Sequence, residues 1–478
     1  MDVAPRCAFV IFGVTGDLAA RKLIPALYAL HVGGALHPET RVIGFARSAP
    51  DDDALRERLG DMLRSYVDDV DDDAWRSLAE RIVSVRGAYD DDGFAALRER
   101  LDALGLDDHV YYTSTPPEAY TAIVRGLDEV GLSRSEDGFR RIVVEKPFGS
   151  DLDSARALNA ELGRAFDESQ VYRIDHYLAK ETAQNLAVLR FANTLFEPIW
   201  SNRFVDHVQI TMAEPMGMEG RGAFYEQAGV IRDVFQNHLL QLLALVAMEP
   251  PARYDADAVR DEKVKVLRAT DCLAPDDVVL GQYGPGDDAP GYREEEGVAP
   301  DSRVPTYAAA AFTVRTWRWA GVPFYVRSGK RLEEKASEIV LRLKAPPHNP
   351  FTELAQPAPP DRLVLRLVPD EGIALRFNAK VPGQGIVLDR VSLGFTYRDG
   401  FGGRVPDAYE TLLADVMQGD ATLFMRADEV EAQWRVVAPL LAPPQHDPEP
   451  YPAGSMGPLS AQTLLERDGR DWHKPGST

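Results

Sequence analysis

Short hydrophobic runs alternate with longer amphipathic stretches along the first 175 residues of the chain. The runs lie within residues 8–12, 41–48, 81–92, 109–120, 138–149 and 171–174. Runs of this length between helical stretches are typical of buried parallel strands joined by helices. The pattern predicts a doubly wound α/β sheet of the Rossmann type, with ligands bound at the carboxyl ends of its strands.

The pattern changes beyond residue 200, where hydrophobic and polar residues alternate or β-branched residues dominate. Such segments occupy residues 204–215, 307–319, 321–328, 337–344, 362–369, 372–380 and 389–398. They predict a large, mostly antiparallel sheet, and a face of that size needs helices or another subunit to cover it. The expected fold class is therefore α/β plus α+β. A dinucleotide-binding Rossmann-type domain is predicted at 1–176, and a substrate-binding and oligomerisation domain at 177–478.

Composition excludes several classes of protein. The 478 residues carry a formal net charge of −22, which argues against nucleic acid or an anionic membrane as partner. No apolar run approaches the roughly 20 residues of a membrane span, and the N-terminus lacks the features of a signal peptide, so we expect a cytoplasmic protein. Cys7 and Cys272, the two cysteines, are far apart in sequence, which argues against a disulfide framework or a cysteine metal site. No metal is expected.

A glycine turn follows the first hydrophobic run. Gly13, Gly16 and Ala19 have the spacing G-x-x-G-x-x-A, a variant of the dinucleotide fingerprint, and a helical pattern with Leu23 and Leu27 comes next. Such a turn lets the N-terminus of the helix meet a phosphate group. An ordinary turn between strand and helix has the same pattern, so this segment alone leaves both interpretations open.

Residues at the ends of later strands add to the predicted cofactor site. An acidic residue after the second strand would bind the ribose of NAD, whereas Arg47, which stands there, suits the 2′-phosphate of NADP. The other interpretation of Arg47 is a solvated surface residue. Tyr89 and Asp90 follow the third strand and Lys146 follows the fifth, so all three are expected on the cofactor side of the sheet. NADP is the expected cofactor, with NAD as a weaker alternative.

The stretch 172–181, YRIDHYLAKE, concentrates polar groups after the sixth strand. Its predicted carboxyl edge presents Asp175, His176, Tyr177 and Lys180 on the side where the cofactor lies. A core would exclude these groups and a plain surface would scatter them. The pattern indicates a small-molecule site.

The chain resembles the glucose-6-phosphate dehydrogenase family in this stretch and in six other segments. They are GVTGDLAARKLIPALY (13–28), EKPFG (145–149), and residues 218–251, 321–339, 406–435 and 451–465. They follow the family's order from about residue 11 to about residue 465. The resemblance implies NADP-linked oxidation of D-glucose 6-phosphate to 6-phospho-D-glucono-1,5-lactone, the first step of the oxidative pentose phosphate pathway. It also implies a homodimer or homotetramer formed through the large sheet.

The resemblance implies roles for particular residues. His238 matches the general base and Asp175 its carboxylate partner. The phosphate-binding group matches His176, Tyr177 and Lys180. Residues that hold the sugar match Lys146, Glu214, Asp233, Lys330 and Lys335, of which the last two are alternatives for the phosphate. The cofactor site matches Gly13, Thr15, Gly16, Asp17, Leu18 and Arg47.

The residues themselves leave two of these roles open. His238 shares the apolar face of a helical segment with Val234 and Phe235, where a lone histidine is more often a core residue; the motif match favours the base. Asp233 would lie roughly 140° around a regular helix from His238. Both can face one ligand only if Asp233 is in the opening turn, and Gly229 just upstream favours such a start.

Two departures from the family pattern bear on the sugar. Ala179 stands where glycine is usual, and its methyl group crowds the loop that carries Lys180. Val368 replaces a glutamine that reaches towards the sugar in many relatives. Another sugar phosphate therefore remains an alternative substrate. A non-catalytic relative would have lost His238 or Asp175, and both are present.

Overall fold

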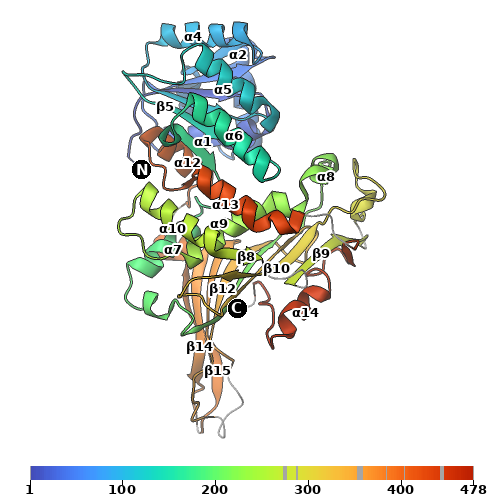
Figure 1. Cartoon of the computed structure of the whole chain (residues 1–478). Helices are drawn as coiled ribbons and strands as arrows, with labels where there is room; N and C mark the ends of the chain where they lie inside the picture. Colours follow the sequence, from blue (N-terminus) through green and yellow to red (C-terminus); the bar gives the residue numbers. More distant parts are fainter. Residues whose placement is uncertain are drawn as a thin grey trace. The chain divides into compact units, whose positions relative to one another are not determined.

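A computed structural model describes residues 2–272, 277–286, 289–351, 359–383, 385–402, 404–441 and 446–476. The chain forms two compact units (Figure 1). Unit 1 contains residues 1–179, 253–260 and 406–431, and unit 2 contains residues 180–252, 261–405 and 432–478. None of the described helices combines the length and the apolar character needed to cross a bilayer.

Unit 1 is built on a parallel sheet whose six main strands were all predicted. They are β1 (Ala8–Phe12), β2 (Arg41–Ala46), β3 (Ile82–Arg86), β4 (His109–Thr113), β5 (Arg140–Val144) and β6 (Val171–Ile174). Their order, β6-β5-β4-β1-β2-β3, is that of a Rossmann fold. The predicted doubly wound sheet is confirmed, and several strands end earlier than the hydrophobic runs that predicted them.

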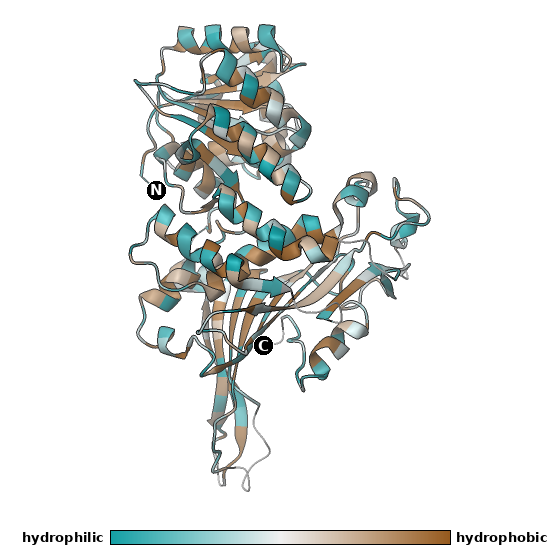
Figure 2. Ribbon diagram, viewed as in Figure 1, coloured by the Kyte–Doolittle hydropathy of each residue, from teal (hydrophilic) through white to brown (hydrophobic). Residues whose placement is uncertain are grey.

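Helices connect these strands and cover the sheet. They are α1 (Ile24–Val32), α2 (Asp52–Tyr66), α3 (Asp72–Ala79), α4 (Asp91–Leu104), α5 (Tyr120–Glu129) and α6 (Leu152–Ala165). Figure 2 shows hydrophobic residues on the strands of this unit and hydrophilic residues on the outer turns of its helices. The core lies between them because each helix turns its apolar stripe to the sheet.

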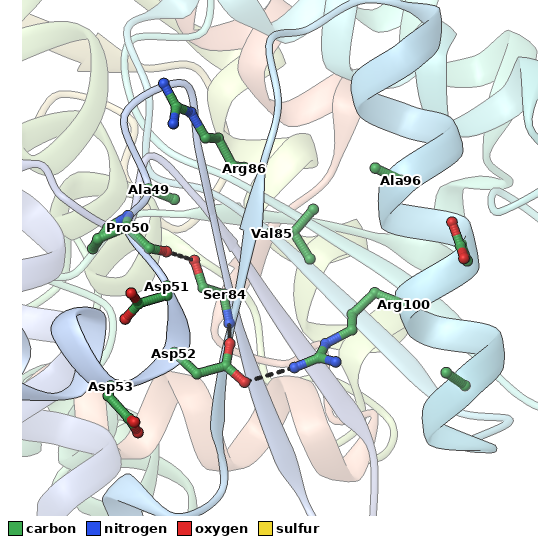
Figure 3. A pocket seen from close by; sticks show the side chains of 12 residues that line it. Ala49, Pro50, Asp51, Asp52, Asp53, Ser84, Val85, Arg86, Ala96 and Arg100 are labelled. Atoms are coloured by element: carbon green, nitrogen blue, oxygen red, sulfur yellow. Dashed lines mark hydrogen bonds and ion pairs between the residues drawn. The ribbon is translucent and has the colours of Figure 1, made fainter.

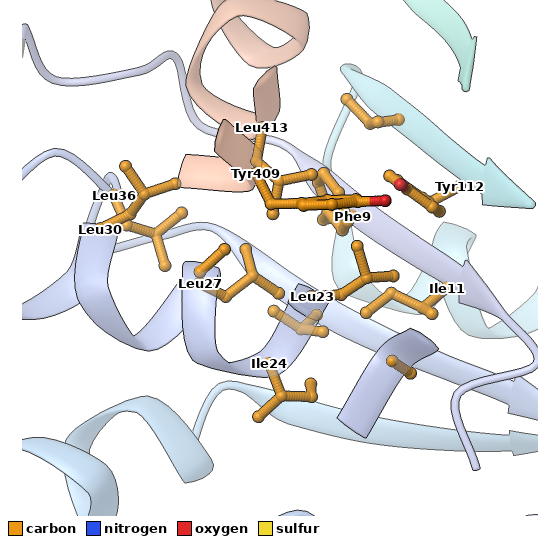
Figure 4. Close-up of a cluster of buried hydrophobic side chains, with 14 of the residues drawn as sticks. Phe9, Ile11, Leu23, Ile24, Leu27, Leu30, Leu36, Tyr112, Tyr409 and Leu413 are labelled. Atoms are coloured by element: carbon orange, nitrogen blue, oxygen red, sulfur yellow. The ribbon is translucent and has the colours of Figure 1, made fainter. Parts of the chain in front are cut away.

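Two later segments complete unit 1. In α12 (Ala408–Gln418), Tyr409 and Leu413 pack against Phe9 and Leu23 in the core (Figure 4). The short strand β16 (Phe424–Met425) pairs antiparallel with β6. The expected single division at residue 176 did not include these returning segments, since a hydrophobic pattern reports local structure and not which distant segments pair.

Unit 2 contains a large mixed sheet in the order β15-β14-β13-β12-β7-β11-β10-β9-β17, with β8 paired to β10. Its strands are β7 (Val205–Ala213), β8 (Thr270–Cys272), β9 (Val278–Tyr283), β10 (Tyr307–Val314), β11 (Pro323–Gly329), β12 (Ala336–Leu343), β13 (Arg362–Val368), β14 (Gly372–Lys380), β15 (Leu388–Thr396) and β17 (Glu449–Tyr451). Most of the pairs are antiparallel, while β7–β11 and β9–β17 are parallel. The predicted fold class is confirmed.

Helices of unit 2 cover part of this sheet. They include α7 (Glu181–Phe191), α8 (Gly222–Val230), a π-helix (Ile231–Leu239) that continues into α9 (Leu240–Ala247), and α10 (Ala256–Ala269), which begins in unit 1. By contrast, β15 exposes Val391, Leu393 and Phe395, and Leu393 is 62% exposed. The predicted cover of the sheet by helices is therefore partial.

A cavity of about 780 Å³ lies beside β3, the edge strand of unit 1 (Figure 3). There the carboxylate of Asp52 accepts a hydrogen bond from the backbone N–H of Ser84 at 2.6 Å and pairs with Arg100 at 2.7 Å. The side chain of Arg56 donates to the carbonyl of Ile82 at 3.0 Å. These side chains occupy backbone N–H and C=O groups of β3 with which a strand of another chain would otherwise pair. The cavity contains none of the predicted site residues, and we assign it to protection of the sheet edge.

Candidate active site

The glycine turn after β1 has a geometry that only glycine fits. Gly13 has a φ of 78°, and a Cβ atom built there would lie 2.3 Å from the carbonyl oxygen of Ser114. The backbone N–H of Gly16 donates to the carbonyl of Gly13 at 2.9 Å, which closes the turn. A side chain at position 13 would be both strained and in collision with the loop after β4. The turn therefore packs closely against the loop after β4, at the carboxyl edge of the sheet.

A cleft of about 640 Å³ adjoins this turn and unites most of the predicted cofactor residues. Gly13, Thr15, Gly16, Arg47 and Tyr89 all line it. They come from the ends of β1, β2 and β3, which parallel strands bring to one edge.

Tyr89 and Arg47 are neighbours in this cleft. The ring of Tyr89 stacks on Phe45, with centroids 5.8 Å apart and planes at 19°. Burial raises the pKa of Tyr89, and the positive charge of Arg47 opposes that rise. The cleft thus combines an aromatic surface, a guanidinium and a glycine turn, which fits a nucleotide with phosphate groups.

Three predicted cofactor residues have other contacts. Asp17 is exposed and pairs with Arg21 at 2.8 Å. Leu18 is partly buried and packs against the core of unit 1. The carboxylate of Asp90 accepts a hydrogen bond from Gly93 N–H at 3.0 Å and caps α4. The cap gives Asp90 a structural role. A cofactor role for Asp17, Leu18 and Asp90 stays a prediction.

The stretch 172–181 separates its polar side chains by burial. Asp175 is 1% exposed, and its side chain accepts a hydrogen bond from the backbone N–H of Tyr177 at 3.0 Å. His176 and Tyr177 are only partly buried, with ring centroids 5.0 Å apart. A tight turn after β6 produces this separation, because consecutive residues there point in different directions.

Tyr409 contacts the predicted site and was missed by the sequence analysis. Its ring is nearly parallel to that of His176, with centroids 6.4 Å apart. Its hydroxyl donates to the buried carboxylate of Glu145 at 3.2 Å, and Tyr112 donates to the same oxygen at 2.5 Å. Glu145 directly precedes the partly buried Lys146. Both tyrosine and glutamate lie in segments that carried the family resemblance, which was the available signal.

Lys180 forms an ion pair in this structure. Its ammonium lies 3.6 Å from the carboxylate of Glu371, which also accepts a hydrogen bond from Thr182 N–H at 2.9 Å. Ala179, just before it, is 4% exposed and belongs to the apolar core of unit 1. The methyl group that was expected to crowd the loop is therefore accommodated by hydrophobic packing.

Unit 2 brings together three residues predicted to hold the sugar. The ammonium of Lys330, at the end of β11, contacts the carboxylate of Glu214 and lies 3.4 Å from that of Asp233. It also lies 5.7 Å from the centre of the Tyr225 ring. Burial by itself lowers the pKa of Lys330, but the two carboxylates outweigh burial and raise it. The cluster is a partly buried cation between two anions, rich in the donors and acceptors that a sugar uses.

The helix that carries His238 differs from the regular α-helix assumed above. Gly229 breaks the chain with a φ of 59°, and a π-helix follows, with Asp233 in its first turn. The predicted new start after Gly229 is confirmed. The separation of roughly 140° applies to a regular helix only, whereas the π-helical bonds here join residues five apart and so bring them onto neighbouring turns. Asp233 and His238, which is 4% exposed, are five apart.

The roles of Lys335 and of the pair Asp175 and His238 stay predictions. Lys335 is exposed and directly precedes β12. Asp175 belongs to unit 1 and His238 to unit 2. Their partnership stays a prediction.

Comparison with known proteins covers nearly the whole chain. Residues 10–185 match the family model "Glucose-6-phosphate dehydrogenase, NAD binding domain", and residues 187–473 match "Glucose-6-phosphate dehydrogenase, C-terminal domain". The chain belongs to the glucose-6-phosphate dehydrogenase family. The resemblance inferred from seven segments is thereby confirmed, and the protein is an oxidoreductase with a pyridine-nucleotide cofactor.

Relatives of this dehydrogenase match it from end to end. Glucose-6-phosphate 1-dehydrogenase of Aggregatibacter actinomycetemcomitans is 45% identical over 487 residues, which cover 99% of this chain and 98% of the relative. The enzyme of Mycolicibacterium smegmatis is 46% identical over 485 residues, covering 98% and 97%.

Two solved structures share its fold. A glucose-6-phosphate dehydrogenase in complex with its substrate glucose-6-phosphate has a TM-score of 0.92 and 36% identity, covering 99% of this chain and 100% of that one. The enzyme from Mycobacterium avium has a TM-score of 0.87 and 39% identity, with the same coverage. Both units of the dehydrogenase are thus represented among solved relatives.

Proposed function

We propose that the protein oxidises D-glucose 6-phosphate to 6-phospho-D-glucono-1,5-lactone and transfers the hydride to NADP. The observation that carries this proposal is the likeness, over 99% of the chain, to a dehydrogenase solved with glucose-6-phosphate. The cleft beside Gly13 and the cluster around Lys330 supply the kinds of groups that the reaction needs. The sequence motifs had indicated the same reaction.

His238 is proposed as the general base, assisted by Asp175. Oxidation of the hemiacetal removes a proton from the anomeric hydroxyl and a hydride from carbon 1, and the hydride goes to the bound nicotinamide ring. An imidazole can accept the proton near neutral pH. Asp175 would orient the ring and stabilise its protonated form. Burial of both side chains supports these roles, since little water competes with a buried base.

Substrate binding is proposed to use two groups of residues. His176, Tyr177 and Lys180 hold the phosphate, whose nearly two negative charges need several cations in so acidic a protein. The sugar is held by Lys146, Glu214, Asp233 and Lys330, with Lys335 as a further contact. In this proposal Lys180 exchanges its ion pair with Glu371 for the phosphate.

The assembly and location of the protein are part of the proposal. A homodimer or homotetramer is supported by the apolar side chains that β15 exposes, Val391, Leu393 and Phe395. Neither nucleic acid nor membrane is proposed as a partner, and the net charge of −22 supports this. A cytoplasmic location is part of the proposal as an expectation only.

Steady-state assays test the proposed reaction directly. Glucose 6-phosphate is offered with NADP and with NAD, and formation of the reduced cofactor is followed by absorbance. Val368 is partly buried at the end of β13 and has no polar group for a sugar hydroxyl, so a second hexose 6-phosphate and free glucose are compared. We expect turnover with glucose 6-phosphate, greater efficiency with NADP, and little with free glucose. Turnover with the other sugar phosphate alone would replace the proposed substrate.

Arg47→Ala is expected to weaken NADP binding by about ten- to hundredfold and to change NAD binding little. A guanidinium can form two charge-assisted hydrogen bonds with the 2′-phosphate, which NAD lacks. Fluorescence titration of each reduced cofactor measures the two dissociation constants. Equal losses for both cofactors would show that Arg47 does not contact the 2′-phosphate.

A further inference from the structure

Two exposed arginines on α2 differ in what they contact. Arg64 pairs with Asp72 at 2.7 Å. Arg58 forms no ion pair within the ranges of the chain that the structure describes, and its Nη2 donates instead to the carbonyl oxygen of Thr15 at 3.2 Å. Other exposed arginines of the chain, such as Arg134, also contact backbone carbonyls, so what distinguishes Arg58 is that its carbonyl belongs to the glycine turn. The guanidinium of Arg58 is thereby held at the glycine turn of the predicted cofactor site.

Thr15 connects Arg58 to the cofactor cleft. Thr15 lines this cleft together with Arg47 and Tyr89. Arg47 therefore lines the cleft, and Arg58 contacts the turn beside it through the Thr15 carbonyl. A guanidinium has five N–H donors in a planar fork, and the contact with Thr15 involves one of its nitrogens. Donors remain for an anion bound at this end of the cleft.

The charge near this turn favours a second cation. The helix α2 begins with Asp51 at its cap, followed by Asp52 and Asp53. A phosphate monoester carries nearly two negative charges at neutral pH, and one exposed guanidinium balances only one of them. A single Arg47 would leave one charge of the phosphate uncompensated. Two other arginines near the start of α2 are already paired, Arg56 with Asp53 and Arg100 with Asp52. A cation on the adjacent turn of the same helix offsets the remaining charge of the phosphate.

We infer that Arg58 supplies a second guanidinium to the 2′-phosphate of NADP and is a further determinant of cofactor specificity. This inference rests on the proposed preference for NADP. The ribose of NAD has a hydroxyl at that position, so NAD gains no charge-assisted contact from Arg58. The contact with Thr15 holds the guanidinium against the turn and reduces the side-chain entropy lost on binding.

Binding of two fragments tests the inference without catalysis. Adenosine 2′,5′-bisphosphate and adenosine 5′-monophosphate differ only in the 2′-phosphate, and calorimetry measures the affinity of the full-length protein for each. Arg58→Gln keeps an N–H donor for the Thr15 carbonyl but removes the charge, and Arg58→Lys keeps the charge. We expect Arg58→Gln to weaken the bisphosphate about three- to tenfold and to leave the monophosphate unchanged. Arg58→Lys should recover part of the loss, and added salt should reduce the difference.

Arg64→Gln is the matched control, because it removes one positive charge from the same helix roughly 9 Å further along its axis. It should leave both affinities unchanged. The inference is overturned if Arg58→Gln binds the bisphosphate like the wild type, or weakens both fragments equally, as a residue that only braces the loop would. If the wild type and Arg47→Ala both fail to distinguish the fragments, the proposed preference for NADP has failed instead.

Discussion

His238→Asn is expected to reduce turnover by roughly 10²–10⁴ while the substrate remains bound. The side chain would lose its ability to accept a proton and keep most of its volume within a buried helix. Loss of the proposed general base would remove an interaction that acts in the transition state, so kcat and kcat/KM should fall together. Stopped-flow measurement of hydride transfer and direct titration of glucose 6-phosphate separate chemistry from binding.

Two variants of the stretch 172–181 control this result. His176→Asn should mainly weaken substrate binding, because a partly buried histidine beside Tyr177 is placed to contact an anion. Asp175→Asn should resemble His238→Asn with a smaller loss, since the base remains. If His238→Asn abolished binding while His176→Asn bound normally without turnover, the two histidine roles would be reversed.

The second large effect is expected from Lys330→Met. This variant keeps the length of the side chain but leaves the carboxylates of Glu214 and Asp233 facing each other without a cation. Removal of one partner from a partly buried ionic cluster costs on the order of 3 kcal/mol, which lowers the thermal midpoint by roughly 6–12 °C. Affinity for the sugar should fall as well. Differential scanning fluorimetry and substrate titration measure the two effects.

Charge neutralisation within the cluster is the discriminating control. Lys330→Met combined with Glu214→Gln removes one of the two opposed carboxylates, so part of the lost thermal stability should return. Lys335→Met, which changes an exposed lysine five residues away, should leave the midpoint within about 1 °C. An unchanged midpoint in Lys330→Met, or no recovery in the double variant, would contradict the view that the cluster is stabilised by its central cation.

The same cluster has a defined dependence on pH. The folded protein raises the pKa of Lys330 above its ordinary value of 10.5, since the carboxylates outweigh burial. A raised pKa means that the stabilisation is complete below the unfolded pKa and is lost as the pH rises through the higher folded value. The thermal midpoint of the wild type should therefore fall more steeply above pH 10.5 than that of Lys330→Met.

The hydrophobic pattern predicted the framework of unit 1 because its signals are local. A buried parallel strand is a short apolar run, and each of the six runs became one of β1–β6. Gly13 and Arg47 could be assigned to the carboxyl edge of the sheet because they directly follow β1 and β2. The end of a strand fixes the edge of the sheet to which the next residues belong.

Other features depend on neighbours that no local pattern specifies. The strand β16 pairs Phe424 with Ile174, and α12 brings Tyr409 beside His176. Asp90 follows a strand as a ligand residue would, yet the start of α4 uses its carboxylate as a cap. Sequence position alone could not distinguish these two uses.

By itself the sequence determined the family, the doubly wound Rossmann type of the first sheet and the residue types needed for a dehydrogenase. Motif spacing and strand ends are properties of contiguous residues, so they can be recognised without a structure. Only the tertiary structure decided that Lys330 lies between Glu214 and Asp233. Glu214 is 116 residues away from Lys330 in the sequence. It also decided that the helix that carries His238 is wound as a π-helix. Both results come from packing and charge pairing between distant segments, and these interactions override the regular periodicity on which prediction from sequence depends.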